Sequence, residues 1–154
     1  MTIFNIHDII QFAIRIEENG ETFYRKAAQS GDNKEAAELF NRLADEEVNH
    51  KKVFEEMKNH LGEYTPNETY EGEYARYLHE YIDQKAIFID GLGDMGKDTI
   101  SALEFALQRE MDSILYYVEV KRFVSDRHHN TINNIIAEEK KHFSRISELK
   151  KKLA

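Results

Sequence analysis

The chain has 154 residues, of which 41% are hydrophobic and 32% are charged, with a single proline and no tryptophan or cysteine. This composition is typical of one soluble globular domain, and the absence of cysteine excludes disulfides, iron–sulfur clusters and thiolate metal sites. The formal net charge of −8 argues against nucleic acid as a partner.

No apolar run approaches the roughly 20 residues that a helix needs to cross a bilayer. The N-terminal residues also lack the basic region and the cleavage site of a secretory signal. We therefore expect a cytoplasmic protein that contacts no membrane.

Apolar residues recur at steps of three and four through most of the chain, which predicts an all-α fold of long amphipathic helices. The first helix is expected over about 5–30 and the second over about 33–60. A long connection over about 61–97 follows, in which Tyr70 to Asp83 has the pattern of a short helix. The third helix is expected over about 98–125, with Ser101 and Glu104 as a capping box, and the fourth over about 130–152.

The links between the first two and the last two helices are short, which favours two antiparallel hairpins. An internal repeat supports this division. Glu17 and Tyr24 recur as Glu110 and Tyr117 at an offset of 93 positions, and Glu47-x-x-His50 recurs as Glu139-x-x-His142 at an offset of 92. The sequence thus predicts a single four-helix-bundle domain over 1–154, built from two copies of one hairpin.

Each predicted helix places a carboxylate in the middle of an otherwise apolar seam, and the second and fourth helices add a histidine one turn later. These six residues are Glu17, Glu47, His50, Glu110, Glu139 and His142. Four unpaired buried carboxylates would cost many kcal/mol, and no Lys or Arg lies on the seams. Two divalent cations would balance them, and carboxylate and imidazole ligands suit iron or manganese. We therefore predict a dimetal site, since a single Glu-x-x-His on a solvated face is common but two repeat-related copies on apolar seams are not.

Neighbouring seam residues refine this prediction. The small residues Ala13, Gly20, Ala106 and Ser113 flank Glu17 and Glu110 and are expected to leave room for metals and a small ligand. Tyr24 and Tyr117 are expected to hydrogen-bond a ligand carboxylate of another helix, with core packing as the alternative. Glu46 and Glu138 are expected to support the histidines in the same way, with a solvated face as the alternative.

Four segments carry a family resemblance: Ile16-Glu17-Glu18-Asn19-Gly20 with Phe23-Tyr24, Glu46-Glu47-x-x-His50, Arg109-Glu110-x-Asp112-Ser113 with Tyr116-Tyr117, and Glu138-Glu139-x-x-His142. With them the chain resembles the rubrerythrin-like members of the ferritin-like superfamily over nearly its whole length. The resemblance implies a ferritin-like bundle in which Glu47 and Glu139 bridge the metals. It also implies that Glu17 and Glu110 are terminal ligands and that each histidine binds one ion.

The chain departs from its relatives at three points. Leu107 stands where rubrerythrins carry an additional glutamate, and the chain lacks the cysteines of their electron-delivering rubredoxin domain. Val48 stands where bacterioferritin has its haem-ligating methionine, so no haem is expected.

The resemblance and the site together predict a non-haem protein with two Fe ions per chain, in a site that would also accept Mn or Zn. We expect an oxidoreductase of oxidative stress, a homodimer, that reduces H2O2 or O2 with electrons from a separate donor protein. One alternative is a ferroxidase or iron-storage protein without a catalytic cycle. Another is a structural bundle with a redox-silent metal site.

Two features of the long connection have other interpretations. Tyr70, Tyr74, Tyr77 and Tyr81 are spaced as one face of a helix, which is expected to dock on the bundle or on a second subunit, with an electron path as the alternative. Gly91-x-Gly93-x-x-Gly96 has the spacing of a dinucleotide-binding turn, but no βαβ unit surrounds it, so we interpret these glycines as turns.

Overall fold

The computed structural model describes residues 6–61, 76–77, 80 and 98–154. Four long helices make up most of this part: α1 (Ile6–Ser30), α2 (Lys34–Asn59), α4 (Thr99–Val120) and α5 (His129–Leu153). Two short 3-10 helices, Lys121–Phe123 and Asp126–His128, join α4 to α5. The structure confirms the predicted all-α four-helix bundle.

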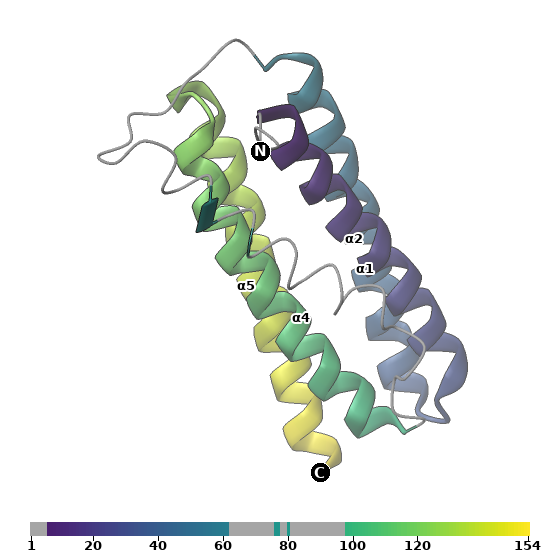
Figure 1. Ribbon diagram of the computed structural model, residues 1–154. Coiled ribbons are helices and arrows are strands. Elements are labelled where there is room, and N and C mark those ends of the chain that lie inside the picture. The colour runs from purple at the N-terminus through teal and green to yellow at the C-terminus, as the bar shows by residue number, and fades with distance from the viewer. Residues whose placement is uncertain (1–5, 62–75, 78–79, 81–97) are drawn as a thin grey trace.

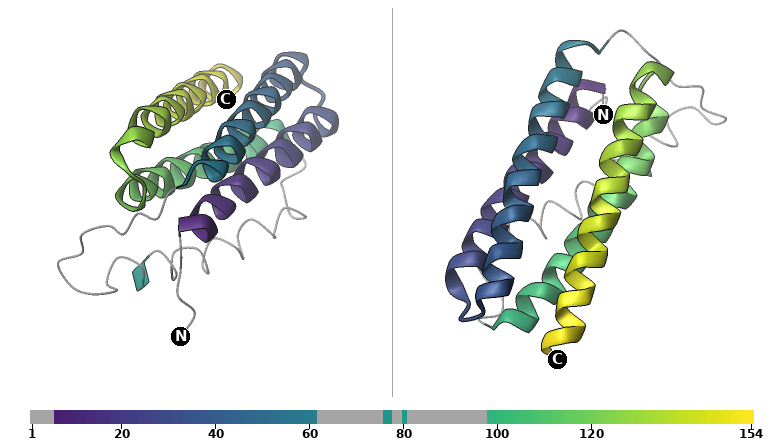
Figure 2. Two further views of the ribbon diagram at one scale, coloured as in Figure 1. Left: turned by 90° about the horizontal axis from the view of Figure 1, so that it is seen from above. Right: turned by 180° about the vertical axis from the view of Figure 1, so that it is seen from behind.

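The helices pair as two antiparallel hairpins, α1 with α2 and α4 with α5. The hairpins lie side by side, as the end-on view of Figure 2 shows. In Figure 1, α2 ends at one end of the bundle and α4 begins at the other. The end of α2 and the start of α4, between which the long connection lies in sequence, are therefore at opposite ends of the bundle.

Side chains just before α2 and α4 fix where these helices begin. The side chain of Asn33 accepts a hydrogen bond from the backbone N–H of Ala36 at 2.8 Å, and Asp98 accepts one from Ser101 N–H at the same distance. The predicted capping box of Ser101 and Glu104 is therefore wrong. Asp98 is the cap, and Ser101 already lies in the first turn, where its hydroxyl donates to Asp98.

Helix α4 ends at Val120, earlier than the predicted end near 125, because the chain tightens into a 3-10 turn and Val124 is extended. The ring of His129 stabilises the backbone where α4 ends. Its Nε2 lies 2.8 Å from the carbonyl oxygen of Lys121 and 3.1 Å from that of Val124, so it donates to carbonyls that have left the helical pattern.

Two apolar clusters fill the bundle, one on each side of a polar layer. The first includes Ile10, Ala13, Phe54, Met57, Tyr117, Val120, Ile132 and Ile135. The second includes Tyr24, Ala27, Phe40, Leu43, Leu103, Ala106, Ile146 and Leu149. The predicted seams account for these residues, and the polar layer falls where each seam carries its glutamate.

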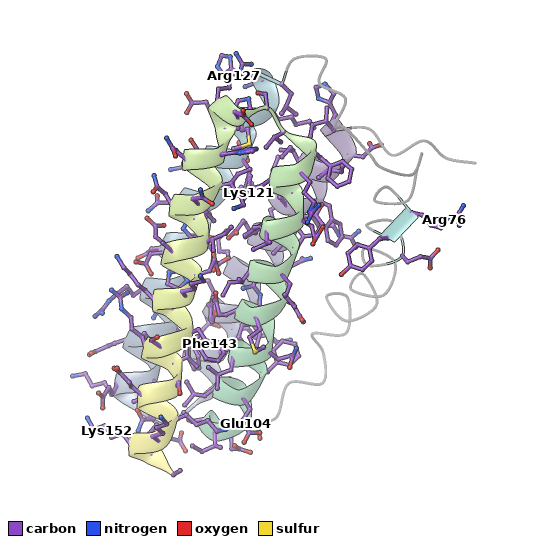
Figure 3. The ribbon with its side chains drawn as sticks, turned by 90° about the vertical axis from the view of Figure 1, so that its left-hand side faces the viewer. Arg76, Glu104, Lys121, Arg127, Phe143 and Lys152 are labelled. Carbon is purple, nitrogen blue, oxygen red and sulfur yellow. The ribbon has the colours of Figure 1, made fainter. Side chains whose placement is uncertain are left out.

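Polar contacts tie the two hairpins together near both ends of the bundle. Figure 3 shows Glu104 and Lys152 at one end and Arg127 at the other. Lys152 Nζ lies 2.9 Å from Glu35 Oε2 of α2, and the Arg127 guanidinium donates to the carbonyl oxygen of His60. Such exposed pairs contribute at most about 1 kcal/mol each, so the apolar clusters dominate the stability.

Most of the long connection lies outside the described residues. The proposed short helix of Tyr70 to Asp83 falls there apart from three positions, as do Tyr70, Tyr74, Tyr81 and the three glycines at 91, 93 and 96. Tyr77 is described, and its side chain is 54% exposed. Within the described residues, every helix is too short or too polar to span a membrane.

Candidate metal centre

The structure brings the six polar seam residues together in one layer, where every one of them is buried. Their ligand-type atoms form two groups, each with atoms within 4.8 Å of one another: Glu17, Glu47, His50 and Glu139, and Glu47, Glu110, Glu139 and His142. Glu47 and Glu139 belong to both groups. Each group has the three carboxylates and one imidazole that a hard divalent cation accepts.

Both histidines direct the same ring nitrogen at the carboxylates. His50 Nδ1 lies 2.8 Å from Glu139 Oε1 and 3.6 Å from Glu17 Oε2. His142 Nδ1 lies 3.6 Å from Glu110 Oε2 and 3.8 Å from an oxygen of each shared glutamate. The Glu-x-x-His spacing produces this geometry because residues three apart on a helix lie on the same face.

The other nitrogen of each histidine faces a glutamate of the opposite hairpin. His50 Nε2 on α2 contacts Glu138 on α5, and His142 Nε2 on α5 lies 2.7 Å from Glu46 Oε2 on α2. These glutamates are half-exposed, so each touches both solvent and an imidazole. A carboxylate at Nε2 keeps the proton on that nitrogen and leaves Nδ1 free to bind a metal.

The two seam tyrosines also reach across the bundle. The hydroxyl of Tyr24 on α1 donates to Glu110 Oε1 on α4, and the hydroxyl of Tyr117 on α4 donates to Glu17 Oε1 on α1. Both rings also pack in the core, Tyr24 on Phe40 and Tyr117 on Phe54. The hydrogen bonds predicted for these tyrosines are therefore present, together with the core packing that was the alternative.

The four buried carboxyl groups differ in pKa, because burial and neighbouring charged groups act on each of them differently. Burial, and then the neighbouring carboxylates, raise the pKa values of Glu47 and Glu139 well above the usual range. Burial also acts against ionisation of Glu110, but Glu139 and His142 outweigh it and lower its pKa to about 2. Glu17 shifts downward for similar reasons, through Glu47 and His50. In the metal-free site these shifts favour the protonated form of Glu47 and Glu139 over that of Glu17 and Glu110.

The pKa of His50 rises to about 10. Burial alone would lower it, but contact with Glu17 and the surrounding negative charge favour the imidazolium. Without metal, the site compensates its carboxylates with protons, and a metal ion has to displace them.

A buried arginine corrects the expectation that no basic residue would balance the seam. Arg109 is only 7% exposed, and its Nη2 lies 3.5 Å from Glu47 Oε2 while its Nη1 lies 3.8 Å from Glu110 Oε1. The guanidinium occupies the space beside Gly20, where an added Cβ would lie 2.6 Å from Arg109 Cζ. The room expected at Gly20 for a small ligand is therefore taken by Arg109.

Leu107 stands one turn before Glu110 and is partly buried against the second apolar cluster. It adds no ligand atom, so the groups formed by the described residues comprise only the six predicted residues.

The donor set fits metal ions. Among the described residues, at least one oxygen of each of the four carboxylates and Nδ1 of both histidines have no hydrogen-bond partner. Buried polar atoms normally find partners, and so many unsatisfied atoms around one point indicate that cations satisfy them.

A groove of about 460 Å³ between α2 and α5 reaches the centre from the surface. Both helices run side by side on the face shown at the right of Figure 2. The groove is lined by both histidines with Glu46 and Glu138, and Lys141 and Arg145 also line it. Glu46 and Glu138, which lie at the Nε2 atoms of the imidazoles, are among its lining residues, and Arg109 is not.

Comparison with known proteins agrees with this geometry. The family model described as Rubrerythrin matches residues 8–150. Among solved structures, a ferritin-like diiron-carboxylate protein of Thermotoga maritima matches with a TM-score of 0.69 and 27% sequence identity, over 100% of this chain and 99% of that one. Curated proteins give no significant match. With the buried carboxylate and histidine cluster, these matches show that the chain belongs to the rubrerythrin family and has a ferritin-like fold.

Proposed function

We propose that the chain binds two iron ions and acts as an oxidoreductase that reduces H2O2 or O2. The single observation behind this proposal is that the two groups of ligand atoms share Glu47 and Glu139. Two adjacent cations that share carboxylates can act on one small molecule together. Glu17 with His50 would complete one position, and Glu110 with His142 the other.

The bound iron pair would supply the electron-transfer chemistry, which the side chains of this protein lack. The other side chains of the protein would keep the metal ligands in fixed orientations. Tyr24 and Tyr117 orient the outer carboxylates through hydrogen bonds from their hydroxyls. Glu138 contacts Nε2 of His50 and Glu46 Oε2 lies 2.7 Å from Nε2 of His142, positions from which these glutamates would orient the imidazoles.

The surroundings of the centre also support a reaction with a small oxidant. The two apolar clusters exclude water along the bundle axis, and the groove between α2 and α5 gives a small molecule a route to the histidines. The 154 residues contain no cysteine to hold a second redox centre. We propose that a separate donor protein supplies the electrons.

Anaerobic loading with Fe²⁺ followed by addition of H2O2 and an artificial reductant tests this function. Turnover of many equivalents of peroxide per chain is expected, with Glu139→Ala inactive because a shared ligand is lost. A single stoichiometric oxidation with further iron retained would instead support the iron-storage alternative. A redox-silent centre that holds Zn²⁺ equally well would support a structural role.

A further inference from the structure

The internal repeat is broken at one point beside the metal centre. At the offset of 93 that relates Glu17 to Glu110, Arg109 corresponds to Ile16 and Gly20 corresponds to Ser113. The structure brings the two exceptions together. Arg109 Nη2 donates to the carbonyl oxygen of Ile16 at 2.6 Å, and its guanidinium fills the space that Gly20 leaves.

The space for the Arg109 guanidinium depends on residues of α1 as well as on α4, which carries the arginine. A Cβ at position 20 would come within 2.6 Å of both Arg109 Cζ and Glu47 Oε2, so only glycine leaves the guanidinium its place. The Tyr24 ring lies below the guanidinium, with its centroid 5.5 Å from Cζ. Glycine within a helix lowers helix stability, so its presence in α1 is explained by the arginine that it admits.

Of the two glutamates that each belong to a single metal position, Arg109 forms an ion pair with Glu110 and not with Glu17. Among the described residues, its ion pairs within 4.0 Å are with Glu47 and Glu110, and none is with Glu17 or Glu139. Glu110 is the outer carboxylate of one metal position only. Its counterpart Glu17, at the other position, has Ile16 where Glu110 has Arg109.

A permanent positive charge at this place changes metal binding. A guanidinium stays ionised at any working pH, and it repels a cation while competing for the carboxylate lone pairs. Two divalent ions alone balance four carboxylates, so with Arg109 the fully loaded centre carries one positive charge in excess. After the first ion has bound, the second ion therefore meets a net charge of −1, whereas it would meet −2 without Arg109, and its binding is weakened.

We propose that Arg109 makes the two metal positions unequal, with the position of Glu110 and His142 the weaker one. The inference rests on the proposed dimetal function. It implies that the chain fills the position of Glu17 and His50 first and the other only at higher metal concentration.

Calorimetric titration of metal-free protein with Co²⁺ under anaerobic conditions tests this proposal. The wild-type chain is expected to bind two ions in steps that differ by at least about tenfold in affinity. Arg109→Ile gives position 109 the side chain of its repeat counterpart. It is expected to reduce the ratio of the first to the second binding affinity by about tenfold, because the second ion binds more tightly. Arg25→Gln removes an exposed arginine of α1 that pairs with Asp45, and it serves as the matched control with an unchanged ratio.

Gly20→Ala is a second variant, which keeps Arg109 but adds a Cβ in the space that its guanidinium occupies. Alanine is a better helix former than glycine, so the substitution should not weaken α1 itself. Like Arg109→Ile, it is expected to reduce the ratio between the two Co²⁺ affinities. Single histidine variants identify the weaker position: His142→Ala should keep the first step intact, whereas His50→Ala should weaken it.

Equal steps in the wild type, or a ratio unchanged in both Arg109→Ile and Gly20→Ala, would overturn the inference while leaving the dimetal proposal intact. A change of both steps by the same factor would also overturn it, since a purely structural role for Arg109 predicts that result. A wild-type chain that binds no Co²⁺ would instead overturn the proposed function together with this inference.

Discussion

Tyr24 on α1 donates a hydrogen bond from its hydroxyl to Oε1 of Glu110 on α4, so that one hairpin orients a carboxylate of the other. Tyr117 and Glu17 repeat this relationship in the opposite direction. The buried centre is thus held by reciprocal bonds between the two halves of the chain, and several predictions of its behaviour depend on them.

Tyr24→Phe removes the hydroxyl and keeps the ring. We expect metal affinity to fall by roughly 10- to 100-fold, the usual effect of losing a group that orients a ligand, with little change in helix content. Competition with a chelator of known affinity measures the loss. Phe23→Leu, in the same core cluster but without a bond to the centre, is the control. Wild-type affinity in Tyr24→Phe would show that the hydroxyl does not position Glu110.

Glu138→Ala removes the carboxylate at His50 Nε2, and Glu46→Ala does the same for His142. Each change is expected to weaken one metal position by about tenfold, because the imidazole loses the partner that fixes its tautomer. Stepwise titration with Co²⁺ should show one weakened step in each single variant and two in the double variant. Identical curves for wild type and double variant would assign both glutamates to the solvated surface alone.

Metal binding near neutral pH should release protons. The pKa values of Glu47 and Glu139 are raised well above the usual range and that of His50 to about 10, so these groups hold protons before metal arrives. Their coordination requires the protons to leave, and metal affinity should increase from about pH 6 to about pH 8. Calorimetry in two buffers with different ionisation enthalpies counts the protons. Equal heats in both buffers would contradict this account.

The metal-free protein should lose stability as the pH rises. The pKa of His50 is raised from 6.5 to about 10, so its contribution to stability is fully present below pH 6.5 and is lost as the pH passes through about 10. A loss of more than about 1 kcal/mol is expected, which is the value of one pKa unit. Thermal unfolding followed by circular dichroism should give a falling Tm between these values, with a smaller decrease in His50→Gln. A constant Tm for the wild type would disagree with the charged imidazole.

Much of the fold and of the site could be predicted from the sequence because the bundle is regular. The seam pattern predicts which face of each helix is buried, and together with the internal repeat it predicts the positions of Glu17 and Glu110. The bonds of Tyr24 and Tyr117 across the bundle are predicted from their position on the same helix faces as these glutamates, with core packing as the alternative.

The seam pattern does not predict that Arg109 lies beside the metal centre, and the reason is physical. A seam argument locates a residue by its position on the helix, but a long side chain can reach a neighbouring face. The signal that was available is the pair of repeat exceptions, Ile16 against Arg109 and Gly20 against Ser113. The sequence pattern also predicts an end of α4 that is too late, because the bonds of His129 to the carbonyls of Lys121 and Val124 depend on the path of the chain after the helix.

Iron analysis after anaerobic reconstitution tests the central claim most directly. The wild-type chain should retain about two irons, whereas Glu47→Ala and Glu139→Ala should retain fewer than one, because each removes a carboxylate that both positions share. Glu104→Ala, at an exposed glutamate of α4, should retain the wild-type amount. Full iron occupancy in either Glu47→Ala or Glu139→Ala would contradict the assignment of this layer as a dimetal centre.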